Sequence, residues 1–473
     1  MNTTLTINIP NIVFTEDIDE SSWAQQLSEK IKYDNERKVM LIFDNESNIW
    51  QQDNSEFILT RKVILEFFNK IIEQLQSLIL LNSNDKIKTR DLKRIQDSVF
   101  KWRSVSRINK IIEAIKFNCN MPFKDIIKIN SEFLHFKNNK SLNLKTFEVL
   151  DTNKDLYAYQ TINADYNPDA DCPKFIKFLN EIFIDDKRKI DVIQRWLGYS
   201  LLSDNLEQKF LICYGDGCNG KSVLFDTIAK ILNSYCKQTS FTLFEDNTSQ
   251  NDFVSPQRLS LIDARSIFVF ESSNYCVLNT AFIKQITGED TIAGRYLYSN
   301  EILEFKINGK IVFVSNHLPV IHDDSNAIWR RLIILKFVQS FIGRENKNLK
   351  NELLQESSGI INWIIEGLKR YYKEGLNVPN DYSTIVDLLK MENNNWMLFV
   401  DDECELDKTF KIEVKNLYNA YKLYCAENNY KPLPKFKFIN TVQNYYKLEK
   451  KRYGHNYDVT LFGIKLKSIP SVV

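Results

Sequence analysis

The sequence has few of the features that mark special classes of protein. It contains eight cysteines without a C-x-x-C pair, and its four histidines do not flank them at the spacing of metal ligands. This pattern predicts reduced thiols in a cytosolic compartment and argues against a zinc site. There is no run of about 18 apolar residues, and the N-terminus lacks a basic segment followed by a long apolar one. We therefore expect neither a membrane span nor export.

The net charge is close to zero, and glycine and proline, the residues typical of linkers, are few. Lysine and arginine number 62 against 61 aspartates and glutamates, so any affinity for nucleic acid must come from a local basic surface. Only 13 glycines and 10 prolines occur among 473 residues, and no linker stands out. The length predicts about three domains, whose boundaries rest on changes of periodicity alone.

What the sequence does have is a glycine-rich segment between a strand and a helix. Residues 211–222 read LICYGDGCNGKS, an apolar run that leads into G-x-x-x-x-G-K-S and then into an amphipathic helix. This order is the context that a phosphate-binding loop requires, whereas a chance glycine-rich turn would not need the flanking strand and helix. In such a loop Lys221 reaches the β- and γ-phosphates and the Ser222 hydroxyl ligates Mg²⁺ at a helix N-terminus that favours anions. The residues expected to hold ATP are Gly215, Asp216, Gly217, Cys218, Asn219, Gly220, Lys221, Ser222 and Val223.

Three further segments carry polar residues next to apolar, strand-like runs. The first run, 265–271, ends in Glu271, which could polarise water and help to hold Mg²⁺; a core strand capped by a surface glutamate is the alternative. The second run, 310–316, ends in Asn316, which suits sensing of a γ-phosphate. Before the third run stand Arg330 and Arg331, which could form a surface ion pair or reach a phosphate held by a neighbouring subunit.

Taken in this order, the motifs resemble those of the superfamily 3 helicases. The resemblance is to the helicase portion of the phage and plasmid primase-helicase family with its poxvirus-type relatives, and it extends from about residue 130 to 345. The segments that carry it, besides the phosphate loop, are 141–146, 166–173, 193–200, 283–295 and 315–319. A mobile genetic element is the expected source.

The resemblance implies an AAA+-like ATPase that forms a ring, usually a hexamer, and moves along single-stranded DNA in the 3′ to 5′ direction. It implies that Lys221 and Ser222 bind phosphate and Mg²⁺, that Glu271 is the catalytic acid and that Asn316 is the sensor. Arg331 is expected to act on the ATP of the neighbouring subunit, with Arg330 as the second choice.

The chain departs from the family pattern at two places. Its second motif has the single acid Glu271 where general Walker B strands have an acidic pair, which bears on Mg²⁺ coordination more than on catalysis. Many relatives also carry a primase at the N-terminus, whereas no acidic catalytic cluster or zinc spacing is recognisable here. We therefore expect no primer synthesis by this polypeptide.

Contacts with DNA are expected in two regions. The family's DNA-gripping hairpin would fall within residues 291–310, and the candidate contacts in and near it are Lys284, Arg295, Lys306 and Lys310. Residues 431–467 hold nine basic residues against two acidic ones, with interleaved tyrosines, which suits phosphate contacts or a docking surface for a protein partner. The candidates there are Lys435, Lys437, Lys450, Lys451 and Arg452.

The predicted fold class is α/β. Helices are expected at 63–75, 173–204, 351–374, 413–425 and 434–447, strands at 38–43 and 457–467, and a hairpin around 138–140. The predicted domains are an α+β region of unassigned role at 1–129, a strand-rich and then helical region at 130–205, an AAA+-like ATPase core at 206–345, a helical lid at 346–394 and a winged-helix-like domain at 395–473.

These observations favour an ATP-dependent replicative DNA helicase of a phage, plasmid or genomic island, with ATP and Mg²⁺ as cofactors. It would act as a homo-oligomer in the host cytosol, without a membrane partner. Its expected partners are single-stranded and forked DNA, origin duplex, and a separate primase or polymerase. Two alternatives share the ATP site: an origin-binding initiator that uses ATP only to assemble, and an AAA+ protein that remodels or loads other proteins.

Overall fold

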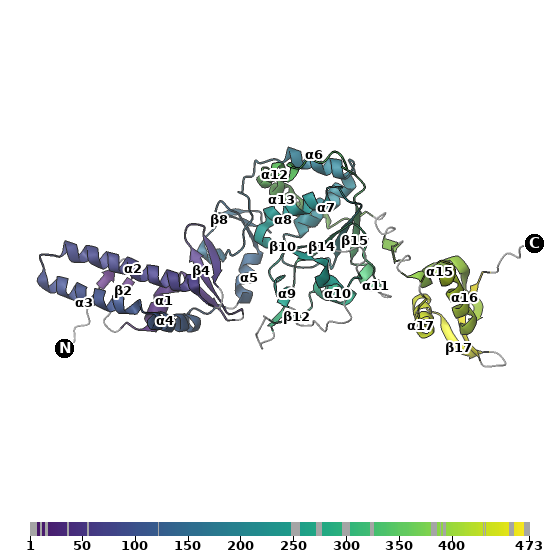
Figure 1. Cartoon of the computed structure of the whole chain (residues 1–473), viewed down its shortest axis with the longest axis horizontal. Helices are drawn as coiled ribbons and strands as arrows, with labels where there is room; N and C mark the ends of the chain where they lie inside the picture. The colour runs from purple at the N-terminus through teal and green to yellow at the C-terminus, as the bar shows by residue number, and fades with distance from the viewer. Residues whose placement is uncertain are drawn as a thin grey trace, which may run out of the picture.

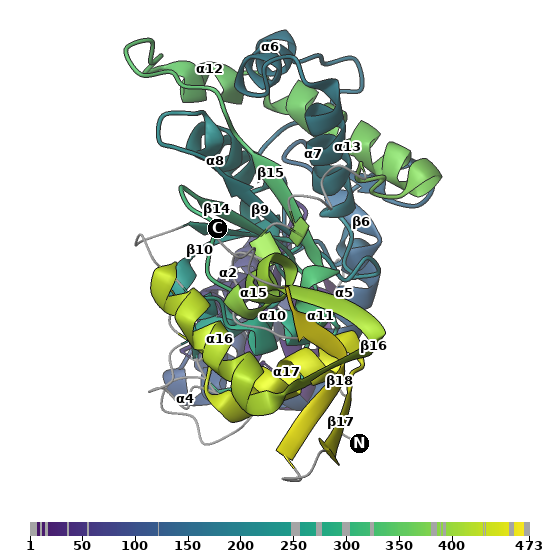
Figure 2. The ribbon, with the colours of Figure 1, turned by 90° about the vertical axis from the view of Figure 1, so that its right-hand side faces the viewer.

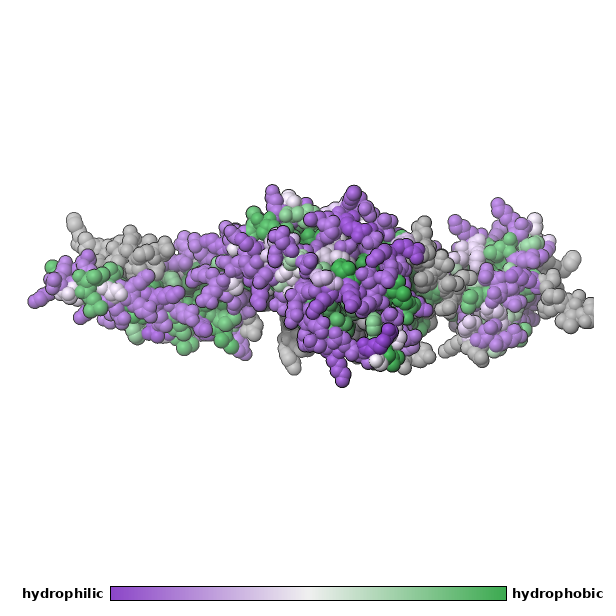
Figure 3. Space-filling model, turned by 90° about the horizontal axis from the view of Figure 1, so that it is seen from above, coloured by the Kyte–Doolittle hydropathy of each residue, from purple (hydrophilic) through white to green (hydrophobic). Residues whose placement is uncertain are grey.

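The protein is elongated, with its N-terminal helices at one end, a central α/β part, and a small C-terminal part at the other end (Figure 1). The computed structural model describes residues 7–9, 12–14, 18–35, 37–53, 56–121, 123–246, 256–270, 277–295, 303–321, 326–379, 386–387, 389–390, 394–428, 430, 432–453 and 458–467. None of the helices in these ranges is long and apolar enough to cross a membrane. Seen from above, the surface is mainly hydrophilic with separate apolar patches (Figure 3).

The N-terminal part packs helices on a small antiparallel sheet. Its core contains Trp23, Phe68 and Ile111, which have no exposed surface. The strand predicted at 38–43 and the helix predicted at 63–75 are confirmed as β4 and α2. The elements are β1 (Ile7–Ile9), β2 (Ile12–Phe14), α1 (Glu20–Leu27), β3 (Ile31–Asp34), β4 (Val39–Asp44), β5 (Ile49–Asp53), α2 (Ile58–Leu81), α3 (Lys86–Trp102), α4 (Val105–Asn118) and α5 (Phe123–Ser131).

A three-stranded antiparallel sheet and two helices precede the central sheet. The hairpin predicted around 138–140 is confirmed, because β6 pairs antiparallel with β7 on either side of it. The helical pair predicted at 173–204 is also confirmed, and its apolar faces are buried. The elements are β6 (Phe133–His135), β7 (Lys140–Asn143), β8 (Val149–Asp151), a short 3-10 helix (Lys154–Leu156), α6 (Pro173–Ile182) and α7 (Lys187–Tyr199).

The central part is built on a five-stranded sheet in which every pairing is parallel. Its strands lie in the order β10 (Cys236–Ser240), β11 (Ser266–Phe270), β14 (Lys310–Ser315), β9 (Phe210–Tyr214), β15 (Leu332–Lys336). Both faces are covered, as a parallel sheet requires. Neighbouring residues of one strand therefore enter different cores: Leu211 packs in the cluster that includes α7 and α8, and Ile212 in the one that includes α10.

Helices cover the two faces of the sheet (Figure 2), and β12, the first strand of a hairpin, lies at the lower side of the central part in Figure 1. The hairpin predicted within 291–310 is present as the antiparallel pair β12 and β13, while residues 296–302 lie outside the described ranges. The elements are α8 (Lys221–Leu232), 3-10 helices at Asn233–Tyr235 and Phe241–Phe244, α9 (Pro256–Leu259), α10 (Thr280–Thr287), β12 (Ile292–Gly294), β13 (Leu303–Phe305), α11 (Asn326–Trp329), α12 (Leu349–Leu354) and α13 (Ser357–Glu374).

The C-terminal part has its own hydrophobic core. Trp396, Tyr421 and Phe438 are almost fully buried in it. The predicted helices at 413–425 and 434–447 are confirmed as α16 and α17, and the predicted strand at 457–467 as β18. The elements are α15 (Asn395–Glu403), β16 (Cys404–Glu413), α16 (Val414–Glu427), α17 (Lys435–Tyr446), β17 (Glu449–Tyr453) and β18 (Asp458–Leu466), with the strands in the antiparallel order β16-β18-β17.

Helices α7 and α13 approach each other through glycines. A Cβ atom on Gly198 would lie 2.1 Å from the backbone nitrogen of Leu368, and one on Gly367 would lie 2.1 Å from the carbonyl oxygen of Gln194. Real side chains cannot make such short contacts with backbone atoms, so these positions hold the helices at a distance that only glycine permits. This pair closes one face of the central sheet.

We predict that Gly198→Ala lowers the free energy of unfolding of the central part by about 1–3 kcal/mol or more, because overpacking must push two backbones apart. Calorimetry or urea denaturation measures the effect. Gly217→Ala is the matched control, since its Cβ would meet nothing within 4 Å. Equal stability of the two variants would contradict the close approach.

Candidate functional site

The loop between β9 and α8 has a backbone that only glycine can adopt at two positions. Gly215 has φ +150° and a Cβ there would lie 2.1 Å from the carbonyl oxygen of Phe337. Gly220 has φ +87°, and its Cβ would lie 2.6 Å from Cγ2 of Ile182. The loop therefore curls tightly at the N-terminus of α8, as a phosphate-binding loop does.

Lys221 lies inside this loop. Its Nζ donates to the carbonyl oxygen of Gly215 at 2.5 Å and to Oδ1 of Asn219 at 2.9 Å, and the side chain is almost fully buried. Nδ2 of Asn219 is buried without a hydrogen-bond partner in the structure. An ammonium group and an unused amide donor at a helix N-terminus fit an anion, so the residues present suit the phosphates of ATP. Ser222 is exposed in the first turn of α8, where its hydroxyl could ligate Mg²⁺.

Parallel pairing brings the other predicted groups toward the same edge of the sheet. Ser315, the last residue of β14, pairs with Tyr214, which directly precedes the loop, so the exposed Asn316 follows beside it. Phe270, the last residue of β11, pairs with Val314. Glu271, which comes next in the chain, lies outside the described residues.

The two adjacent arginines have opposite environments. Arg331 is buried, and its guanidinium donates to Oγ1 of Thr287 at 3.1 Å and to the carbonyl oxygen of Ala327 at 2.7 Å. Arg330 is exposed. Arg331 is thus engaged within its own chain, and this environment favours Arg330, the second choice, over the predicted first choice, Arg331, as the group that could meet a neighbour.

Sequence reasoning missed the surroundings of Arg330. Lys209 and Lys390 line a groove of about 370 Å³ with it, and the Lys209 Nζ donates to the carbonyl oxygen of Arg330 at 2.9 Å. Burial lowers the pKa of Lys209. No local sequence signal could have found this neighbourhood, because it follows from the register of the sheet: Phe210 pairs with Leu332, so the residues just before these two strands are neighbours.

The hairpin region corrects one predicted DNA contact. Lys310 is 1% exposed, its Nζ donates to the carbonyl oxygens of Leu202 and Asn308, and burial lowers its pKa to about 7. The prediction that Lys310 contacts DNA is wrong, because the residue opens the central strand β14 and its side chain is enclosed. Arg295 and Lys306, which follow β12 and β13, are exposed, and Lys284 on α10 is half-buried.

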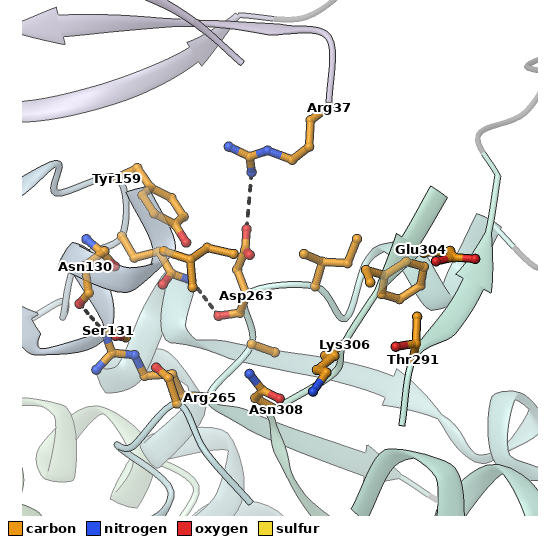
Figure 4. A pocket seen from close by; sticks show the side chains of 16 residues that line it. Arg37, Asn130, Ser131, Tyr159, Asp263, Arg265, Thr291, Glu304, Lys306 and Asn308 are labelled. Atoms are coloured by element: carbon orange, nitrogen blue, oxygen red, sulfur yellow. Dashed lines mark hydrogen bonds and ion pairs between the residues drawn. The ribbon is translucent and has the colours of Figure 1, made fainter. Parts of the chain in front are cut away.

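A cavity of about 430 Å³ lies at the base of this hairpin (Figure 4). Asp263 stands at its centre and forms an ion pair with Arg37 of the N-terminal part at 3.3 Å, while Arg37 also binds Asp34 at 2.6 Å. Burial raises the pKa of Asp263 to about 6. Lys306 lines the same cavity, so the hairpin, the sheet and the N-terminal part meet here.

The five predicted C-terminal cations lie on two neighbouring elements. Lys435 and Lys437 occupy the first turn of α17, and the other three belong to β17. All five are exposed. The β17 cations are Lys450, Lys451 and Arg452, and the first of them pairs with Leu461 of β18.

Comparison with known proteins relates both ends of the chain to one family. A model of the family described as D5 N terminal like matches residues 21–184, and one described as Poxvirus D5 protein-like matches residues 391–471. A protein of Acanthamoeba polyphaga mimivirus, "Putative helicase L207/L206", is 26% identical over 323 residues, which are 64% of this chain and 33% of the relative. "Putative helicase 121R" of Invertebrate iridescent virus 3 is 25% identical over 272 residues, 54% of this chain and 28% of the relative.

The chain thus spans about a third of the length of these viral relatives. Among solved structures, the apo structure of the NrS-1 C terminal region shares the fold, with a TM-score of 0.52 and 12% sequence identity over 95% of this chain and 100% of that one. The flanking family matches, the viral relatives and the shared fold agree with one another. They show that this chain belongs to the D5-type family of primase-helicases.

Proposed function

We propose that the chain is the ATP-driven motor of a replicative DNA helicase, with an AAA+-like core. The observation that carries this proposal is the loop at residues 215–220, in which the Lys221 ammonium and the unused Asn219 amide donor converge at the N-terminus of α8. Asn316 follows the adjacent strand, where it can sense a γ-phosphate. When bound, Mg²⁺ neutralises the developing charge on the β- and γ-oxygens, and Ser222 and Glu271 would hold it.

The position of Arg330 supports hydrolysis between two copies of the chain. Arg330 lies two residues before Leu332, the first residue of β15, whereas the phosphate loop follows the last residue of the adjacent β9. A strand of five residues spans about 16 Å, so Arg330 lies about one strand length from the phosphate loop of its own subunit. Cations at one edge and phosphates at the other can meet only in a head-to-tail assembly, which forms a ring when the rotation between subunits closes. The family resemblance favours a hexamer.

Movement along DNA would be driven by the hairpin β12–β13. Loss of the γ-phosphate changes the angle between subunits, and the hairpin then pulls one strand with it. Arg295 and Lys306 are the exposed cations at the described ends of this hairpin, and phosphates of a single strand are their natural partners. The 3′ to 5′ direction is part of this proposal and comes from the family resemblance. The C-terminal part, with two helices followed by a two-stranded wing, is proposed to be a winged helix.

The first test is Lys221→Ala. This variant should lose ATP turnover and ATP-dependent unwinding of tailed forks, because no other cation occupies the described phosphate loop. Radiolabelled ATP hydrolysis and strand separation on 3′- and 5′-tailed forks measure this. Wild-type protein that hydrolyses ATP on DNA but leaves every fork intact would contradict the motor and favour the initiator or remodeller.

The second test compares the two arginines. Arg330→Ala should lower turnover by about a thousandfold or more while nucleotide binding persists, as expected for an arginine that acts on a neighbour's ATP. Arg331→Ala should instead lower the melting temperature, because its guanidinium bonds lie within the chain. Mixing Lys221→Ala with Arg330→Ala protein should restore part of the turnover, since some interfaces then combine two intact groups. A mixture as inactive as its components would contradict the shared pocket.

The third test concerns the hairpin. Lys306→Ala should weaken binding of single-stranded DNA and reduce the slope of log affinity against log salt by about one. Lys310→Met should leave affinity and slope unchanged, because that ammonium is enclosed. Fluorescence anisotropy at several salt concentrations measures both variants. Equal effects of the two substitutions on DNA affinity would contradict a contact between the hairpin and DNA.

A further inference from the structure

A groove of about 520 Å³ crosses the C-terminal part where α16, α17 and the strands β17 and β18 meet. It is lined by the buried apolar side chains of Val414 and Ile439 and by exposed lysines, which is the composition of a site for a flat, charged ligand. The lining residues are Glu413, Val414, Lys415, Lys435, Phe436, Ile439, Asn440, Lys450 and Val459.

Phe436 is the most unusual member of this groove. Its neighbours on α17, Phe438 and Ile439, are buried in the domain core, whereas Phe436 is 77% exposed. A single exposed apolar residue is common, but this one stands beside cations from three separate elements. The aromatic ring thus offers a free face in a charged setting, which is how proteins hold stacked nucleobases.

The positions of the groove's lysines do not stabilise the helices that carry them. Lys435 opens α17, and the macrodipole makes the start of a helix unfavourable for positive charge. Lys415 near the start of α16 and Lys450 on β17 add to the same field, and Glu413 is the one carboxylate among the lining residues. The lysines of the groove therefore attract anions to it.

We propose that this groove holds one unpaired nucleobase of single-stranded DNA, stacked on Phe436, with the flanking phosphates on Lys415, Lys435 and Lys450. The inference rests on the proposed function, which makes single-stranded DNA the substrate, and it names a second contact away from the hairpin. Asn440, which also lines the groove, carries the donor and acceptor pair that suits a base edge.

The shape of the groove favours a single strand over a duplex. Bases within a duplex are stacked on both sides, so their faces cannot reach Phe436, and the apolar side chains of the groove would gain nothing from the sugar-phosphate backbone. An unpaired base exposes both faces and can enter the groove while its phosphates remain beside the lysines. An acidic peptide with an apolar side chain is the competing occupant, and the test below separates the two.

The experiment uses the full chain carrying Lys221→Ala, so that ATP turnover does not contribute to binding. Single-stranded DNA that contains 5-iodouracil is bound and irradiated, and the cross-linked peptides are identified by mass spectrometry. We expect a cross-link at Phe436 with single-stranded DNA and its loss with the fully paired duplex. Protein that binds the labelled strand without any cross-link to 435–440 would overturn the proposal.

Affinity gives an independent readout. Phe436→Ala should weaken binding of a normal single strand by about fivefold or more, the range for loss of one base stack, and leave binding of an abasic strand unchanged. Leu423→Ala, which removes another exposed apolar side chain from the same part, is the matched control and should change neither. Unchanged affinity of the Phe436 variant would also overturn the proposal.

Two outcomes separate this inference from the proposed function. Binding of a fluorescent Asp/Glu-rich peptide that requires Phe436, with DNA binding that does not, would assign the groove to a protein partner and leave the motor intact. Failure of wild-type protein to unwind forks, with the Phe436 cross-link present, would remove the motor and leave the groove as a DNA site.

Discussion

The candidate site depends on one constraint, the parallel pairing of β14 between β9 and β11. Because all three strands run the same way, their carboxyl ends meet at one edge of the sheet, where the phosphate loop and Asn316 lie side by side. Any antiparallel pairing here would send one of these groups to the opposite edge. The buried, apolar faces of the sheet hold this arrangement, and the glycine contacts between α7 and α13 keep one of its layers close.

Positively charged side chains lie at the amino-terminal edge of the same sheet, opposite the phosphate loop. Lys209, Arg265, Lys310 and Arg331 all stand at or just before the first residue of a strand in this sheet. Arg265 and Lys310 are buried and donate to backbone carbonyl oxygens, which compensates for part of the cost of enclosing a charge. The hydrogen bonds of these buried cations stabilise the amino-terminal edge of the sheet. Arg330 is exposed at this edge and is the group that can reach another molecule.

The ion pair between Asp263 and Arg37 links the N-terminal part to this braced edge. Its carboxylate belongs to the segment that leads into β11, and its guanidinium to the turn between β3 and β4. Lys306 lines the cavity beside it, so a shift of the hairpin would change the surroundings of the pair. The N-terminal part is therefore connected to the candidate motor at the point where DNA contact is proposed.

The sequence alone was sufficient to predict the features that depend on a local pattern of residues. Gly215, Gly220 and Lys221 predict a phosphate loop because only those residue types permit its backbone and charge, and the apolar periodicities of 173–204 and 413–425 predict helices that form. Register and burial are different, because they depend on which segments meet. Adjacent Arg330 and Arg331 look alike in sequence, and Lys310 looks like a surface lysine. Only the tertiary structure decided that Arg331 and Lys310 turn inward, since burial depends on the neighbours that the sheet brings together and not on the residues beside them in the chain.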